Sequence, residues 1–435
     1  MASTLSFTIP RGVRKVGDRF RSLFPEAGAL ASFANQCALF CFFLFGSTSL
    51  CALVRACPWA HSVSDLSRAV EQFPGDRFMR RLRASILRRY KGEVDPADFC
   101  FAVDDTSNPK YGRFTYRCGH WRDSKKPFLG QKVLVVVLVD IKRGFALPLA
   151  FAFAVKKTEP DYKSMPDLAL GLFDDILAAG FPKLDVASDS WFDSAAFMLG
   201  LHRLGLTYAG EIKSNRVLRG SASPKVPWRK MPAFFAGRTR RAVRAKLEHP
   251  SHKKRRGRKS QRFMVEETVM IRKYPHPVKV VAVYNRRNEK KAFAYHLSTD
   301  RLMSGARLWL LGRARWNIEV MFRDLKQNLS FGRLPCTRKA GSDLAVAIPF
   351  AILVTLRLEP ELWGLSKDDR RTIGTKVAEI REQALSQSLA VLMGRPGSKL
   401  AERLRARRAP ERLRQKPRLK PAGGRARPAS VGAQA

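Results

Sequence analysis

Residues 132–155 read KVLVVVLVDIKRGFALPLAFAFAV, which is two long hydrophobic runs on either side of a short polar connection. The connection, residues 141–144, ends in Gly144, a residue suited to a tight turn between two strands. Valine and phenylalanine, which favour strands, are frequent in the two runs. The stretch therefore predicts an antiparallel β-hairpin, with strands over residues 132–140 and 145–155.

The segments around this hairpin alternate between strand and helix patterns. Upstream, residues 99–103 are a short hydrophobic run that predicts a buried strand. Downstream, residues 168–179 and 194–204 have helical spacing, and residues 184–187 and 207–212 predict strands. The order β-β-β-α-β-α-β predicts an α/β fold with a mixed central sheet flanked by helices.

The region before this core predicts helices. Residues 27–54 carry no charge, but a Gly-Ser-Thr-Ser segment at residues 46–49 divides them. Because a membrane span needs about 20 mostly apolar residues, two buried helices joined by a turn are favoured over a membrane anchor. Residues 61–90 predict two further helices, the first capped by Ser62 or Ser64. The second is basic and could contact DNA phosphates.

The region after residue 219 changes character. Residues 220–274 are polar and basic, notably residues 238–241 and 253–259. The predicted organisation has six parts: a helical N-terminal region (1–98), the first part of the α/β core (99–218), a basic β-rich insertion (219–302), the second part of the core (303–358), C-terminal helices (359–394) and a disordered basic tail (395–435). Within the insertion, alternation predicts strands over residues 263–271, 278–283 and 292–297.

The net charge of the chain indicates what kind of partner it binds. Its 435 residues carry a formal net charge of +44, with a pI near 10.9, so a polyanion, most simply nucleic acid, is the expected partner. No Walker-type phosphate loop or Ser/His/Asp spacing is present in the sequence. Residues 1–26 lack the order of a signal peptide, and the seven cysteines include no CxxC pair. We expect a cytoplasmic protein with reduced thiols.

Residues 313–329, RARWNIEVMFRDLKQNL, predict an amphipathic helix with a polar stripe. At about 100° per residue, Glu319 lies about 40° and Lys326 about 20° from Arg315. Apolar side chains fill the adjacent sector, so the carboxylate should lie at the rim of a buried face. An ordinary surface ion pair at i, i+4 has the same pattern, and the rest of the chain has to distinguish the two interpretations.

Two upstream carboxylates give Glu319 candidate partners. Asp104 is predicted to end the first strand, and Asp189 the strand that follows the first helix. Strand ends beside a helix can bring such groups within reach of a shared Mg²⁺ or Mn²⁺. Two ions ~3.5–4 Å apart can promote in-line phosphoryl displacement. Asp105 is an alternative to Asp104, and Asp185 competes with Asp189, although Asp185 begins its strand.

These motifs resemble the DDE transposases of bacterial insertion sequences, whose signature is Tyr-(2)-Arg-(3)-Glu-(6)-Lys. Arg315, Glu319 and Lys326 match at that spacing, and Gly312 stands where the signature has Tyr. The resemblance extends from about residue 99 to residue 355. It includes four further segments, at residues 103–106, 187–192, 212–216 and 297–300.

The resemblance implies an RNase H-like core with a β-rich insertion before the Glu-bearing helix. It also implies two divalent ions held by Asp104, Asp189 and Glu319, and a homodimer that joins the terminal inverted repeats of a mobile element. The predicted activity is cleavage at the element's ends and transfer of the 3′-hydroxyl to target DNA. The residues expected to support DNA or phosphate binding are Arg315, Lys326, Lys213, Asn215, Arg216 and Arg323.

Two other functions remain open. The first is a catalytically inactive relative of a transposase that only binds DNA, which the Gly312 departure favours. The second, weaker alternative is a basic protein anchored in a membrane by residues 27–54. For the favoured function, the location would be the cytoplasm of a prokaryote, in association with the nucleoid, and no membrane would be involved.

Overall fold

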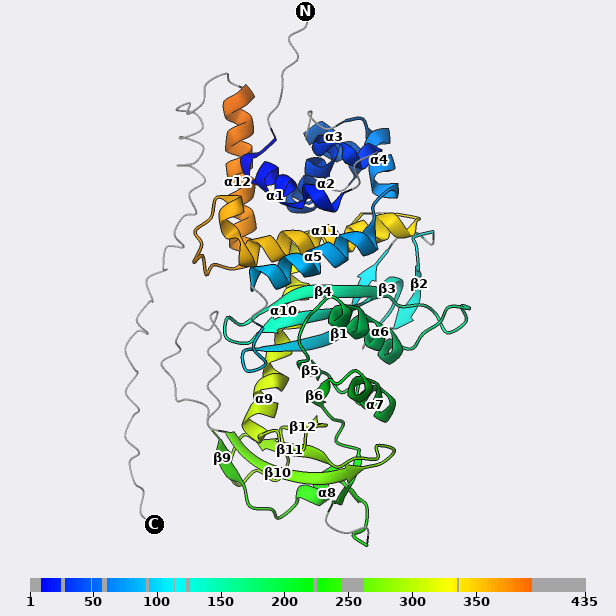
Figure 1. Cartoon of the computed structure of the whole chain (residues 1–435), viewed down its shortest axis with the longest axis vertical. Coiled ribbons are helices and arrows are strands. Elements are labelled where there is room, and N and C mark those ends of the chain that lie inside the picture. The colour runs from blue at the N-terminus through cyan, green and yellow to red at the C-terminus, as the bar shows by residue number, and fades with distance from the viewer. Residues whose placement is uncertain are drawn as a thin grey trace, which may run out of the picture.

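The computed structural model describes residues 9–24, 28–47, 49–56, 61–90, 94–110, 112, 114–122, 126–221, 225–243, 262–334 and 336–392. The predicted basic run at residues 253–259 and the predicted tail from residue 395 lie outside these residues. A long mixed sheet runs from the middle of the molecule to one end, and the N-terminal and C-terminal helices lie together at the other end (Figure 1).

The strands are β1 (Phe99–Pro109), β2 (Gly119–Arg122), β3 (Pro127–Asp140), β4 (Phe145–Phe153), β5 (Asp185–Ser188), β6 (Thr207–Glu211), β7 (Val217–Gly220), β8 (Arg229–Lys230), β9 (Arg241–Val243), β10 (Arg262–Ile271), β11 (Val278–Tyr284) and β12 (Ala294–Ser298). The α-helices are α1 (Arg11–Phe20), α2 (Phe33–Phe45), α3 (Leu50–Ala56), α4 (Val63–Glu71), α5 (Gly75–Arg89), α6 (Met165–Ala178), α7 (Ala195–Arg203), α8 (Met231–Phe235), α9 (Gly305–Ala314), α10 (Trp316–Asn328), α11 (Lys339–Leu358) and α12 (Ile373–Leu392). Short 3-10 turns are η1 (Arg21–Leu23), η2 (Ala29–Ala31) and η3 (Pro360–Trp363).

The predicted hairpin is present as β3 and β4, which pair antiparallel with one register shift between Val136 and Val137. β3 begins five residues earlier than predicted, because its N-terminal part pairs with the short strand β2, which the sequence did not reveal. The other side of β3 pairs antiparallel with the whole of β1. Both hydrophobic runs of the hairpin are thus largely buried, as their composition requires.

The mixed α/β fold predicted from the sequence is confirmed. β1 pairs antiparallel with β3 on one side and parallel with β5 on the other, and β5 pairs parallel with β6. The prediction that β1 ends at Asp104 was wrong. β1 continues to Pro109, because β3 supplies backbone partners along its full length, whereas pairing with β5 stops at Val103. Asp104 lies where the parallel pairing ends.

The insertion strands extend the core sheet and do not form a separate one. β12 pairs antiparallel with β6, and β11, β10, β7 and β8 follow in that order, so the whole sheet has 12 strands. The three predicted strands of the insertion correspond to β10, β11 and β12. The basic region therefore shares a continuous backbone scaffold with β1, which carries Asp104, and with β5, which Asp189 directly follows.

The N-terminal helices pack around α2. Ser62 caps α4, as one of the two alternatives predicted, by accepting a hydrogen bond from the Asp65 amide at 3.2 Å. α2 ends at Phe45, and Gly46 caps it with a left-handed φ of 72°, which turns the chain toward α3. The core of this bundle is a cluster of phenylalanine rings in contact, which are Phe20, Phe24, Phe40, Phe73 and Phe78.

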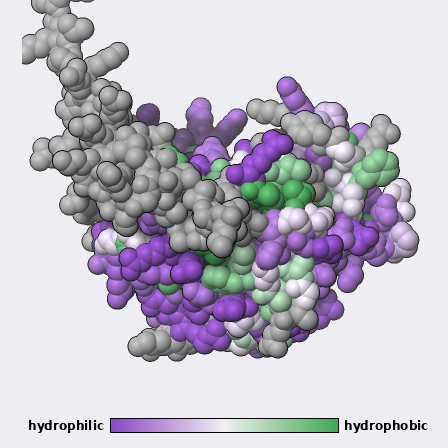
Figure 2. All heavy atoms as spheres, turned by 90° about the horizontal axis from the view of Figure 1, so that it is seen from above, coloured by the Kyte–Doolittle hydropathy of each residue, from purple (hydrophilic) through white to green (hydrophobic). Residues whose placement is uncertain are grey.

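α2 is buried on every side by this packing, which explains its uncharged sequence without a lipid phase. In the part of the chain that the structure describes, α11 alone has the length and hydropathy of a membrane span, and 94% of its apolar window is buried. The described surface seen from above in Figure 2 is mostly hydrophilic, with smaller hydrophobic patches.

The helix predicted over residues 313–329 is divided, and the prediction of one continuous helix was wrong. α9 ends just before Arg315 and α10 begins just after it. The Asn317 side chain donates from Nδ2 to the carbonyl of Ala314 at 3.0 Å, and the Ile318 amide bonds instead to the carbonyl of Arg315 at 2.9 Å. A side chain that takes over a carbonyl of the i, i+4 ladder interrupts a helix.

Candidate active site

The end of the parallel pairing between β1 and β5 brings Asp104 and Asp189 together. Val103 is opposite Ser188, so the next residue on each chain is a carboxylate. Burial, followed by the negative charge of Asp189, raises the pKa of the Asp104 carboxyl to about 7. Asp189 follows the last residue of β5, and its Oδ1 accepts a hydrogen bond from the Trp191 amide at 2.9 Å, which fixes the turn.

Arg315 connects Asp104 to Glu319. Its Nη1 lies 3.2 Å from Asp104 Oδ2, and its Nη2 lies 2.9 Å from Glu319 Oε1. The i, i+4 pair expected from the helical stripe is therefore present. Arg315 is buried, while Glu319 is half-buried on the first turn of α10. The helix joint thus places a guanidinium between a strand carboxylate and a helix carboxylate, and its positive charge opposes the rise in the pKa of Asp104.

The two alternative aspartates have other partners. Asp105 points to the opposite face of β1 from Asp104, as alternation requires, and forms an ion pair of 2.9 Å with Lys132. Asp185, at the other end of β5, lies 3.1 Å from Arg307 on the first turn of α9. The structure therefore brings Asp104, and neither of these alternatives, to Arg315 and Glu319.

The residues fit a divalent cation by charge and donor type. Carboxylate oxygens are the ligands that Mg²⁺ and Mn²⁺ prefer. The positive charge of such an ion would offset the desolvation and the charge repulsion that raise the pKa of Asp104. Among the described residues, no three His, Cys, Asp or Glu side chains lie close enough to hold an ion as they stand. The Arg315 guanidinium already supplies a positive charge between Asp104 and Glu319.

The predicted DNA-supporting residues fall into three groups. Lys213 and Asn215 are exposed in the loop after β6, and Arg323 is exposed on α10. Lys326 is half-buried on the same helix. Arg315, in the ion pairs described above, and Arg216 form the third group, whose side chains bind carboxylates.

Arg216 has a different environment. It is bound to Asp193, a fully buried side chain, through Nε and Nη2 at 3.0 Å each. Burial raises the pKa of Asp193 and Arg216 opposes this. Arg216 therefore compensates a buried charge, a contact that its sequence motif did not reveal.

Some residues at the site were missed by the sequence analysis. Trp191 and Trp316 are 62% and 57% exposed, and each is a near neighbour in sequence of a candidate ligand. The Lys213 Nζ lies 5.8 Å from the centre of the Trp191 ring, within cation–π range. His296, on β12, is buried against α9 close to Arg315. The only sequence signal for His296 was the missing Tyr at Gly312.

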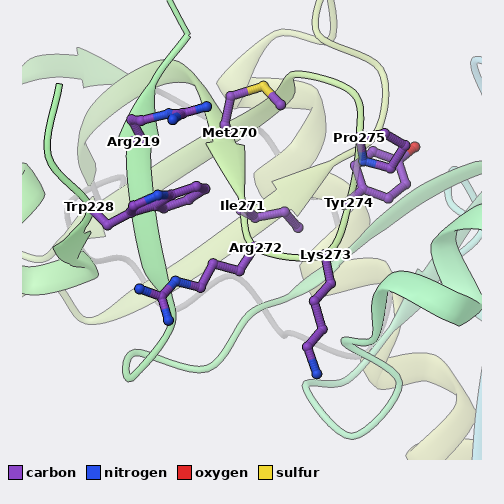
Figure 3. Close-up of a pocket in the computed structure, with 8 residues that line it drawn as sticks. All are labelled: Arg219, Trp228, Met270, Ile271, Arg272, Lys273, Tyr274 and Pro275. Carbon is purple, nitrogen blue, oxygen red and sulfur yellow. The ribbon is translucent and has the colours of Figure 1, made fainter. Parts of the chain in front are cut away.

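A shallow pocket of about 550 Å³ lies at the far part of the sheet, between β7 and the end of β10 (Figure 3). The Trp228 ring has the Arg219 guanidinium 4.8 Å from its centre and the Arg272 guanidinium 5.7 Å from it. Arg272 and Lys273 are exposed. Four strand spacings separate β5 from β10, which is roughly 20 Å. We call these four residues, Arg219, Trp228, Arg272 and Lys273, the basic–aromatic patch.

The large mixed sheet flanked by helices is the architecture of an RNase H-like fold. The chain belongs to the DDE superfamily of endonucleases, whose family model matches residues 41–291. The matched span includes Asp104 and Asp189 and ends before Glu319.

No curated protein matches the chain. A cryo-EM structure of a piggyBac transposase synaptic complex with hairpin DNA aligns with 93% of this chain and 82% of that chain, at 10% identity and a TM-score of 0.42.

Proposed function

We propose that the protein is a DNA transposase of the bacterial insertion-sequence type, which cleaves at the ends of a mobile element and joins the freed 3′-hydroxyl to target DNA. The observation that carries this proposal is the bridge from Asp104 through Arg315 to Glu319, with Asp189 beside Asp104. Membership of an endonuclease superfamily and the net charge of +44 support it.

In this proposal, Asp104, Asp189 and Glu319 hold divalent metal, Mg²⁺ or Mn²⁺, with two ions at the site. Such ions activate a water or hydroxyl and stabilise the leaving oxygen during in-line displacement at phosphorus. Arg315 would offset the repulsion among the carboxylates before metal is bound, and its charge would support the phosphate in the transition state. Lys326 and Arg323 add positive charge farther along α10.

The DNA substrate is proposed to be the terminal inverted repeats and the target duplex, held by a homodimer. Exposed Lys213 and Trp191 form a cationic and aromatic rim beside Asp189, which suits a nucleotide strand entering the site. The basic–aromatic patch lies roughly 20 Å away across the sheet, or roughly six base pairs along a duplex. We propose that it binds the DNA backbone outside the cleavage point.

The proposed division of labour follows the chain. Residues 1–98 would bind DNA, residues 99–218 and 303–358 would form the catalytic core, and residues 219–302 the DNA-binding insertion. Exposed Arg77, Arg80 and Arg88 on α5 support a DNA contact by the first region. The C-terminal segments 359–394 and 395–435 would add structural support and a basic tail. The proposed location is the prokaryotic cytoplasm, at the nucleoid.

A second candidate function is an inactive relative that only binds DNA. The absence of three grouped metal ligands among the described residues favours it, as does Gly312 in place of the signature Tyr. The two functions differ in one experiment with the full chain, supercoiled plasmid carrying the DNA that flanks the coding region, and Mg²⁺ or Mn²⁺. Nicked or linear product that disappears in Glu319→Gln supports the transposase. End binding without cleavage by the natural protein supports the inactive relative.

A further inference from the structure

Gly312 is needed because the His296 ring occupies the space above it. A Cβ added at Gly312 would lie 2.5 Å from His296 Cε1 and 2.7 Å from His296 Nδ1, closer than real contacts allow. Position 312 is where the resembled signature has Tyr. A side chain from β12 therefore fills the place that the helix residue leaves open, and the Trp309 ring packs edge-on against it at 5.4 Å.

The His296 ring is shielded from solvent, and its two nitrogens are available for hydrogen bonds. It is 1% exposed, and among the described residues neither ring nitrogen has a hydrogen-bond partner. Burial, with the positive charge of Arg315 as the second cause, lowers the pKa of the imidazole to about 4. The ring is therefore neutral at pH 7, with one nitrogen as a donor and the other as an acceptor.

Arg315 has a matching unused donor. Its Nη1 and Nη2 are paired with Asp104 and Glu319, but its Nε is buried with no hydrogen-bond partner among the described residues. Buried donors and acceptors in native proteins are almost always paired, often through an ordered water. A neutral imidazole and an unpaired guanidinium N–H in one neighbourhood are complementary.

We propose that His296 is a positioning residue that replaces the missing signature side chain and accepts a hydrogen bond from Arg315 Nε through one buried water. This contact holds the guanidinium in the plane from which Nη1 and Nη2 reach Asp104 and Glu319. His296, Arg315 and Asp104 then form one polar chain from the insertion strand β12 to the core strand β1. The inference rests on the proposed function only in the consequence for cleavage.

The first test compares three full-length variants. His296→Phe fills the space without an acceptor, whereas His296→Gln and His296→Asn keep one. We expect His296→Phe to reduce the single-turnover cleavage rate at saturating DNA and Mg²⁺ at least tenfold, with end binding within twofold of the natural protein. One of the two amide variants should recover the rate to within about threefold. Equal rates for His296→Phe and the natural protein would overturn the proposal.

A readout without activity separates this inference from the proposed function. In ¹⁵N-arginine-labelled protein, the Arg315 Nε–H signal is assigned by its loss in Arg315→Lys. His296→Phe should shift that signal and speed its exchange with solvent at least tenfold, and the amide variants should restore it. An unchanged signal contradicts the inference even in an active enzyme. A protein that never cleaves DNA but shows the shift contradicts only the proposed function.

The second test exchanges the two side chains. Gly312→Tyr alone should lower the unfolding midpoint, because its ring meets that of His296. The double variant Gly312→Tyr/His296→Gly should recover the midpoint and at least part of the cleavage rate. If the losses in unfolding midpoint from the two single changes add up in the double variant, the two side chains do not share one space. That result would overturn the proposal that His296 replaces the signature side chain.

Discussion

Arg315 and Asp104 form an ion pair of 3.2 Å across 211 positions of sequence, from a helix joint to the middle of a strand. The pair connects α10 to β1 and sets the distance between the two candidate metal-binding carboxylates on those elements. Because Arg315 also contacts Glu319, changes at any of the three residues should alter the charge balance of the other two.

If Asp104 and not Asp105 binds the metal, substitutions at these two neighbouring residues of β1 should have very different effects on cleavage. Asp104→Asn and Glu319→Gln should reduce Mg²⁺-dependent cleavage by at least about a thousandfold, because each removes a charged metal ligand, while end binding stays near that of the natural protein. Asp105→Asn is the matched control, since Asp105 is paired with Lys132 on the other face. Plasmid nicking and gel-shift assays measure the two properties. The opposite pattern would assign the metal to Asp105.

If the Arg315 guanidinium takes the place of a metal ion between the carboxylates, its removal should make the stability of the folded protein depend on a divalent cation. Arg315→Ala leaves the carboxylates without their positive partner, so it should lower the free energy of unfolding by about 3 kcal/mol in the metal-free protein. Added Ca²⁺ should raise the unfolding midpoint of Arg315→Ala more than that of the natural protein, because binding to the native state stabilises it. The Arg315→Ala/Asp104→Asn double variant is the control. An equal Ca²⁺ response in all three proteins would contradict the assignment.

His296 predicts a pH dependence of stability with a definite sign. Its pKa is about 4 in the folded protein against 6.5 as the ordinary value, so the unfolded state binds the proton first as pH falls. The contribution of His296 to the free energy of unfolding is fully present above about pH 6.5 and is lost as the pH falls toward 4. The loss amounts to about 3 kcal/mol, because each unit of pKa difference corresponds to about 1.4 kcal/mol. Denaturant unfolding of His296→Gln at several pH values should lack this difference. Parallel pH profiles would show that His296 titrates normally.

The basic–aromatic patch predicts a change in salt dependence. Removing two phosphate contacts with Arg272→Ala/Lys273→Ala should weaken DNA binding and reduce the slope of log affinity against log salt by roughly two. Exposed Lys367 and Arg370, in the segment before α12, supply a control pair of the same charge. Fluorescence anisotropy with a long duplex measures both. A slope change of the same size in the control would mean that only net charge matters.

Sequence patterns were sufficient for most elements that a local period decides, although the helix predicted over residues 313–329 is interrupted by the Asn317 side chain. The hydrophobic runs that became β3 and β4, the capped helix α4 and the strands of the insertion were predicted because each element's hydrophobic pattern is contained in its own residues. The Arg315–Glu319 pair was predicted for the same reason, since four residues span one turn. Where pairing with a distant strand decided the outcome, as at the end of β1 and in β2, the sequence was silent.

The sequence by itself determined the chemistry available to this protein, namely a large positive charge and carboxylates next to buried strands. The tertiary structure decided which of them meet. It turned Asp104 toward Arg315 and Asp105 toward Lys132, and it placed His296 over Gly312. The physical reason is that a contact between residues on different strands and helices depends on sheet register and helix packing, which no local pattern encodes.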